Sequence, residues 1–198
     1  MHAQAIESTA DIVALEAGLD AAERDARALV EGLAEAAGGW RAQPGSWSVA
    51  ECLDHLATSN EVYLEAMRGV AADAAAHNRT RKAPARPGVI GRLFVRWLEP
   101  PVSPWLKGRA PRLIRPRPAP ALTDASNRFL ASQEAVRAFL RRYGDIDLAG
   151  VRFPNPFIRG VRFSLATGLH VLEAHERRHL WQAWRTRRAA EQAIAGRP

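Results

Sequence analysis

The sequence predicts an all-α protein built as a four-helix bundle, and three observations lead to this expectation. Apolar residues recur with helical spacing over four long segments, and no segment shows the alternation of apolar and polar residues that is typical of strands. The links between the segments are short or moderate, apart from one long insertion, which favours helices packed side by side. No internal repeat is evident, so we expect residues 1–198 to form a single domain.

The first helix is expected over residues 5–37, because its apolar residues follow one helical stripe and Gly38 with Gly39 can end it. The second helix begins at Ser48, which together with Glu51 fits a capping box that satisfies free amides at the helix start. It continues to about residue 76. The stripe of the first helix consists of Ile6, Ile12, Leu15, Leu19, Ala22, Ala26, Leu29 and Leu33.

Residues 79–121 form a basic, proline-rich insertion between the second and third long helices. Eight of the thirteen prolines lie in 79–118, which excludes one continuous helix there, although Val89–Leu98 is amphipathic and predicts a short one. The same 79–118 stretch holds eleven lysines and arginines and one acid, Glu99, a net charge of +10. Because the whole chain carries +7, the remainder carries −3, and the positive charge belongs to the insertion.

Several roles for the insertion remain open from the sequence. Phe94, Trp97 and Leu98 can pack onto the bundle while the arginines stay in solvent. Alternatively, the insertion is a lid, a clamp for an acidic substrate, or a contact for anionic lipid. Nucleic acid is the least favoured partner, because no helix-turn-helix, zinc-finger or RNA-binding signature is present.

The third long helix is expected from about Thr123 to Tyr143, where Gly144 can end it. A connection rich in phenylalanine and proline follows, and the last helix runs from about Ser164 to Ile194. The composition, 47% hydrophobic and 25% charged, is ordinary for a soluble globular protein. The single cysteine excludes an internal disulfide, and the N-terminus lacks the pattern of a secretory signal, so we expect a cytoplasmic protein without a transmembrane segment.

Three histidines are candidate metal ligands. His175 and His179 are four residues apart, so they share one helix face at a spacing at which two imidazoles can bind one divalent ion. His55 lies on the second helix, and all three fall at edges of apolar faces, where two helices can meet. Three imidazoles leave one coordination position open, as in catalytic sites. The spacing alone leaves a solvated face as an alternative, and His170, on the opposite side, is expected in solvent.

Two further polar residues near these histidines are candidates for a supporting role. Gln182 lies on the same flank as His175 and His179, one turn later, and can orient a ligand or a bound water. Glu176 projects towards the centre of the apolar face, where a carboxylate needs donors or a cation. It therefore either supports a metal ligand or forms a salt bridge, and the salt bridge is the preferred interpretation.

Two segments together resemble the DinB/YfiT-like proteins. Residues 47–56, Trp-Ser-Val-Ala-Glu-Cys-Leu-Asp-His-Leu, resemble the W-S-x-x-E-x-x-x-H-L start of that family's second helix. Residues 175–182, His-Glu-Arg-Arg-His-Leu-Trp-Gln, resemble its terminal H-x-x-x-H-x-x-Q motif. The resemblance implies an up-down-down-up bundle that holds a divalent metal ion (nickel, zinc or iron) through His55, His175 and His179.

Some members of that family are thiol-dependent transferases or isomerases, which use mycothiol, bacillithiol or glutathione. A metal ion with an open position can bind a thiol and lower its pKa, which presents a thiolate nucleophile at neutral pH. The resemblance thus implies a metal-dependent thiol S-transferase or hydrolase that acts on a small molecule, with a low-molecular-weight thiol as co-substrate.

Two non-enzymatic alternatives remain open. One is a bundle that binds a ligand or a partner, for example as a homodimer. The other is a basic adaptor that contacts nucleic acid or a membrane through residues 79–118. Cys52, three residues before His55, and the tryptophans near the two motifs are expected to pack rather than to act, although Trp47, Trp181 and Trp184 can also wall a pocket.

Overall fold

The computed structural model describes residues 2–101 and 110–195, and this part of the chain is mostly helical. The long helices are α1 (His2–Val30), α3 (Val49–Ala76), α5 (Leu122–Tyr143) and α6 (Leu165–Ala195). The shorter elements are α2 (Glu35–Gly38), α4 (Val89–Leu98), the 3-10 turn η2 (Arg112–Ile114), β1 (Arg152–Pro154) and β2 (Arg162–Ser164).

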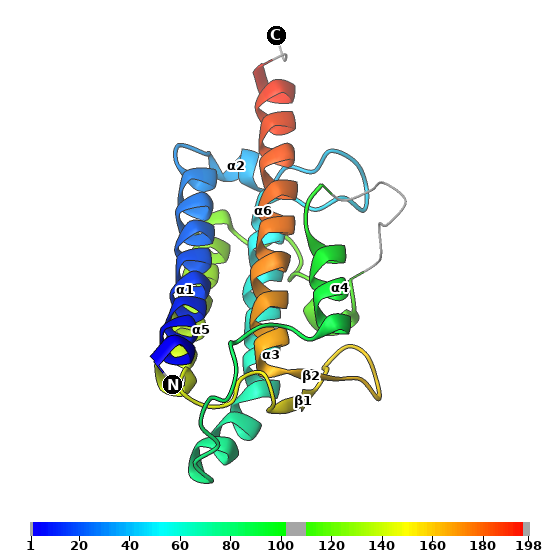
Figure 1. Ribbon diagram of the computed structural model, residues 1–198. Coiled ribbons are helices and arrows are strands. Elements are labelled where there is room, and N and C mark those ends of the chain that lie inside the picture. Colours follow the sequence, from blue (N-terminus) through cyan, green and yellow to red (C-terminus); the bar gives the residue numbers. More distant parts are fainter. Residues whose placement is uncertain (1, 102–109, 196–198) are drawn as a thin grey trace.

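The four long helices lie side by side (Figure 1). α3 packs against both α5 and α6, and α1 contacts the same two helices. α4, inside the basic insertion, lies against α6 on the outside of this group. No described helix is long and apolar enough to cross a membrane.

The apolar core is divided into two clusters that follow each other along the helices. In α6, Leu172 belongs to the first cluster and Leu180 to the second. Between the clusters lies a layer of buried polar side chains, each at most 4% exposed: Asn60, Ser132, Gln133 and Glu176. Asn60 Nδ2 donates to Ser132 Oγ at 3.1 Å and to Glu176 Oε1 at 2.9 Å. Because these bonds join three helices at one level, they fix the register of α3, α5 and α6.

The first predicted helix is divided, which corrects the expectation of one helix over 5–37. α1 ends at Val30, and α2 begins at Glu35. Gly32 lies between them with φ 68°, a left-handed conformation that ends a helix readily when the residue is glycine. The apolar stripe is confirmed from Leu15 to Leu29, because its five members there are buried: Leu15, Leu19, Ala22, Ala26 and Leu29. Ile12 and Leu33 are half-buried, and the side chain of Ile6 lies outside the described residues.

A small hairpin was not predicted from the sequence. β1 and β2 pair antiparallel, with Arg152 opposite Ser164 and Phe153 opposite Phe163. Both phenylalanine rings lie in the core, where the hairpin covers the start of α6. Strands of three residues are too short for an alternating pattern to be recognised, and Pro154 argues against a strand.

The basic insertion packs on the protein through one face of α4. Leu98 is buried, and the half-buried ring of Phe94 lies 5.3 Å from that of Phe163. Trp97, which was expected to pack as well, is 45% exposed. The alternative in which Phe94 and Leu98 pack is therefore confirmed for these two residues, whereas Trp97 is only partly covered, by Phe94 and Arg178.

Candidate metal centre

His55 lies in the second turn of α3, and the start of that helix is fixed by polar contacts. The amide of Glu51 donates to Ser48 Oγ at 3.1 Å, and the amide of Ser48 donates to Glu51 Oε2 at 3.0 Å, which confirms the predicted capping box. Arg41 donates to the same carboxylate through two nitrogens. Because these contacts fix where α3 begins, they also fix the face on which His55 lies.

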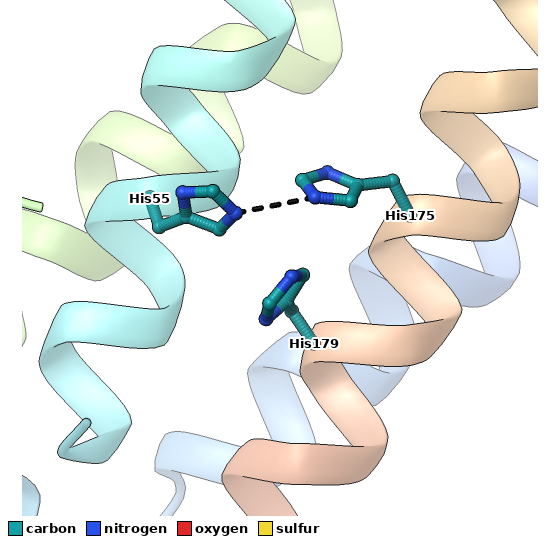
Figure 2. A group of neighbouring side chains, drawn as sticks. All are labelled: His55, His175 and His179. Atoms are coloured by element: carbon teal, nitrogen blue, oxygen red, sulfur yellow. Dashed lines mark hydrogen bonds between the residues drawn. The ribbon is translucent and has the colours of Figure 1, made fainter. Parts of the chain in front are cut away.

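The fold brings the three candidate histidines together between α3 and α6 (Figure 2). One ligand nitrogen of each ring lies within 4.8 Å of the other two. The ring centroid of His55 lies 4.9 Å from that of His175 and 4.5 Å from that of His179. The ring centroids of His175 and His179 are 4.6 Å apart. His55 and His179 are buried, whereas His175 is half-buried, so the cluster keeps an accessible side.

The backbone carbonyl of Ile114, in η2, sets the orientation of the His55 ring. It contacts His55 Nδ1, and because a carbonyl only accepts hydrogen bonds, Nδ1 carries the proton. The lone pair of His55 is therefore on Nε2, which lies 3.2 Å from Nε2 of His175. Two nitrogens on one tetrahedral zinc ion, each about 2.0–2.1 Å from it, are about 3.3 Å apart. The observed separation therefore suits one shared ion.

Burial keeps the three imidazoles in the neutral form that binds metal ions. It lowers the pKa of His55 to about 4, although a neighbouring carbonyl and a carboxylate act in the opposite direction. Burial also lowers the pKa of His175 and of His179 well below the ordinary value of 6.5, with further lowering by the adjacent imidazoles and by Arg178. Each histidine is therefore neutral at pH 7 and has a nitrogen lone pair available for a ligand bond.

Trp47 covers one side of the cluster. Its ring centroid lies 4.6 Å from that of His55 and 5.5 Å from that of His179. Helix-end packing was the preferred interpretation for this tryptophan, and its contacts with two candidate ligands show that it also walls the site. Trp184, by contrast, donates from Nε1 to Asp25 at 2.7 Å, away from the histidines.

Of the two supporting candidates, only Gln182 lies beside a histidine. Its side chain raises the pKa of His179 slightly, but the two do not reach hydrogen-bond geometry, and the buried Nδ1 of His179 has no partner in the described part of the chain. Glu176 instead accepts from Asn60 in the buried polar layer. Within residues 2–101 and 110–195 no lysine or arginine forms an ion pair with Glu176, so the preferred salt bridge was wrong.

A buried ion-pair network behind His55 was not recognised in the sequence. Asp54 is fully buried and accepts from the Arg117 amide at 2.8 Å, from Arg117 Nε at 2.8 Å and from Arg128 Nη1 at 2.9 Å. Burial raises the pKa of Asp54, but these hydrogen bonds outweigh it and the net pKa is lowered. Arg117 follows η2 by three residues, so the network ties the carbonyl of Ile114 to the helix that carries His55.

His170 and Cys52 lie outside the histidine cluster. His170 was expected in solvent, but it is half-buried, and its Nε2 lies 3.1 Å from the carbonyl oxygen of Ala85 in the insertion. Cys52 is buried in the core, and burial raises the pKa of its thiol. It is therefore neither a thiolate at neutral pH nor part of the histidine cluster.

The fold and the cluster together define a helical protein with a candidate three-histidine metal centre between two long helices. Residues 18–183 match the DinB superfamily, and the chain therefore belongs to this superfamily. The match includes both segments that carry the histidines, so the resemblance inferred from those segments is confirmed. We found no match among curated proteins or among solved structures.

Proposed function

We propose that His55, His175 and His179 bind one divalent metal ion and leave one coordination position open for a small molecule. The observation that carries this proposal is the convergence of three neutral imidazoles, with ligand nitrogens within 4.8 Å of one another. A buried polar group without a partner is costly, and the unpartnered Nδ1 of His179 supports a site that is completed by a ligand bond or by a hydrogen bond with a group such as water.

Nickel, zinc and iron are the proposed metals, because imidazole nitrogens suit all three. The bound ion would lower the pKa of a thiol or of a water molecule in the open position. The protein would contribute the orientation of His55 through the Ile114 carbonyl and the exclusion of water by Trp47. The proposed reaction class is thiol S-transfer or metal-assisted hydrolysis on a small molecule, with a low-molecular-weight thiol as partner in the first case.

The proposal extends to the architecture and setting of the protein. We infer an up-down-down-up four-helix bundle over one domain of residues 1–198, with 79–121 as an insertion. The contacts of α1 and α3 with both α5 and α6 support a bundle of these four helices. We also propose that the protein is cytoplasmic and forms a homodimer. Light scattering of the full chain measures the oligomeric state.

The decisive experiment is the metal content of the untagged full chain, measured by mass spectrometry. We expect about one equivalent of nickel, zinc or iron in the wild type and almost none in the His175→Ala/His179→Ala double variant, because one imidazole alone binds these ions weakly. His170→Ala is the matched control, since it removes a histidine of the same helix outside the cluster. Equal metal in the folded double variant, or none in the wild type after supplementation, would contradict the site.

A second candidate function is favoured by the outer face of α4. Val89, Ile90, Leu93 and Trp97 are 65%, 78%, 65% and 45% exposed, and at 100° per residue they fall within about 100° of one another. The exposed Arg92 and Arg96 lie along one edge of this stripe. Apolar residues beside arginines on one exposed helix are typical of segments that lie on an anionic membrane surface.

Vesicle cosedimentation tests this second function. We expect the full chain to bind vesicles of phosphatidylglycerol more tightly than vesicles of phosphatidylcholine, and Ile90→Asp/Leu93→Asp to weaken binding by at least about tenfold, because two apolar contacts are lost. Val13→Asp is the control, since Val13 is an exposed apolar residue of α1. Binding that is unchanged in the double variant would reject the membrane function. Salt-sensitive binding to DNA by all three proteins would favour nucleic acid instead.

A further inference from the structure

Arg178 lies on α6 between the two histidines of that helix and is half-buried. Its guanidinium carbon is 5.5 Å from the centroid of the Trp97 ring, so α4 orients the side chain from the outside. Nη1 is buried and has no hydrogen-bond partner among the described residues. A buried guanidinium donor without an acceptor is unfavourable, and this one lies beside a site that we propose to bind a small molecule.

The carboxylates of Asp54, Glu99 and Glu173 are paired with arginines other than Arg178. Asp54 accepts from two other arginines, Arg117 and Arg128. Glu99 and Glu173 both pair with Arg177, the residue directly before Arg178. The Glu176 carboxylate accepts from Asn60 in the core. Within residues 2–101 and 110–195, Arg178 therefore has no ion-pair partner.

The position of Arg178 places its charge near all three histidines. Arg178 follows His175 by three residues and directly precedes His179, and residues three apart are neighbours on the surface of a helix. In agreement with this position, its positive charge adds to the effect of burial in lowering the pKa of the three histidines. Two other arginines of α6 also lie over tryptophan rings, but neither is a buried donor without a partner. Arg185, over Trp181, is exposed, and Arg187, over Trp184, donates to backbone carbonyls and pairs with Glu191.

We propose that Arg178 binds a carboxylate of the small molecule whose other end occupies the open position of the candidate metal centre. This inference rests on the proposed function of the three histidines and adds the charge of the ligand. Guanidinium groups bind carboxylates through two parallel hydrogen bonds, which fix orientation as well as charge. The ligand is then an anionic small molecule, and in the thiol-transfer case it carries both a thiol and a carboxylate. Arg178 thus discriminates between ligands, whereas the histidines bind the metal.

The experiment uses the full chain loaded with cobalt(II), because a thiolate bound to cobalt gives a charge-transfer band in the near ultraviolet. The probes are mercaptoacetate, 2-mercaptoethanol and cysteamine, whose second groups are negative, neutral and positive. We expect the wild type to bind mercaptoacetate at least about tenfold more tightly than 2-mercaptoethanol, since the carboxylate gains charge-assisted hydrogen bonds. Cysteamine should bind more weakly still, because Arg178 repels its ammonium group.

Variants separate Arg178 from chelation of the metal by the probe itself. Arg178→Gln should lose the preference for mercaptoacetate and keep the affinity for 2-mercaptoethanol. Arg178→Lys should retain part of the preference, and Arg185→Gln, the exposed control on the same helix, should retain all of it. Cobalt content and circular dichroism, measured for each protein after titration, verify loading and folding.

The outcomes distinguish this inference from the proposed function. Failure of the wild type to bind cobalt overturns both. Normal cobalt binding with a preference for mercaptoacetate that persists in Arg178→Gln overturns the role of Arg178 alone. Cobalt binding without a charge-transfer band for any thiol, or with equal affinities for all three, also overturns it and leaves the metal centre intact.

Discussion

The carbonyl of Ile114 decides which nitrogen of His55 faces the other two rings, so one backbone atom is as important to the site as a side chain. Because Nδ1 donates to this carbonyl, Nε2 is free for a ligand bond. His77 shows the contrast, since it is exposed at the end of α3 and its Nδ1 lies 2.9 Å from the carbonyl oxygen of Asp73. Both histidines therefore have Nδ1 at a backbone carbonyl. What distinguishes His55 is that its Nε2 faces a second imidazole, whereas His77 belongs to no candidate metal cluster of the described residues.

The ion pair between Arg117 and Asp54 should control the metal affinity through this carbonyl. Arg117→Ala removes the contact of Arg117 Nη2 with Asp54 at 2.7 Å and loosens the segment that holds Ile114. Asp54 keeps its bond with Arg128, so α3 is expected to remain folded. Because groups that orient a ligand typically change metal affinity by about 10–100-fold, we expect zinc affinity to fall by about tenfold, measured against a competing chelator.

The matched control for this prediction is Arg112→Ala. Arg112 is exposed within η2, and its side chain forms no hydrogen bond or ion pair in the described part of the chain. Zinc affinity should therefore be unchanged in this variant. A wild-type affinity for Arg117→Ala would show that Ile114 is held in place without the ion pair.

At the scale of the elements, the long helices could be predicted because their signals are local. Apolar spacing indicated α1, α3, α5 and α6, and the Ser48 capping box placed the start of α3 to within one residue. The break between α1 and α2 was missed because a single residue, Gly32, decides it inside a periodic pattern. The β1–β2 hairpin was missed because its pairing joins residues eight to twelve apart, and no local pattern records that pairing.

The candidate metal centre also has a part that could be predicted from the sequence and a part that could not. Two histidines on one helix and a third on another could be placed on helix faces, because the helical period determines those faces. The Ile114 carbonyl and the Arg117–Asp54 pair depend on the path of an irregular segment back to α3. The sequence gives no period for such a segment, although a buried acid directly before His55, together with nearby arginines, was a signal that could have been used.

At the scale of the whole molecule, the buried polar layer couples stability to pH. Burial raises the pKa of Glu176 from 4.5 to about 7, and the hydrogen bond that it accepts from Asn60 only partly opposes this. The folded state therefore holds this proton more tightly than the unfolded state does. The stabilisation is fully present below about pH 4.5 and is lost as the pH rises to about 7.

His55 acts in the opposite direction over part of the same range. Its pKa is lowered to about 4, so its contribution to stability is present above pH 6.5 and is lost as the pH falls towards 4. The two effects overlap between pH 4.5 and 6.5, and the pH profile of the wild type alone does not separate them. A comparison of a Glu176 variant with the wild type at each pH separates the two effects, because the contribution of His55 is the same in both proteins and cancels.

We expect Glu176→Gln to stabilise the metal-free protein at pH 8 relative to the wild type, and to have a smaller or reversed effect at pH 5. A shift of 2.5 pH units in the pKa, from 4.5 to about 7, corresponds to a free-energy change between these pH values of at most about 3 kcal/mol. Urea denaturation at both pH values, in the presence of a chelator, measures this difference. Glu65→Gln, an exposed position on α3, should show no pH-dependent difference. If the free energy of unfolding of Glu176→Gln differed from that of the wild type by the same amount at pH 5 and pH 8, Glu176 would titrate alike in both states. The polar layer would then fix the register of the helices without making the stability of the fold depend on pH.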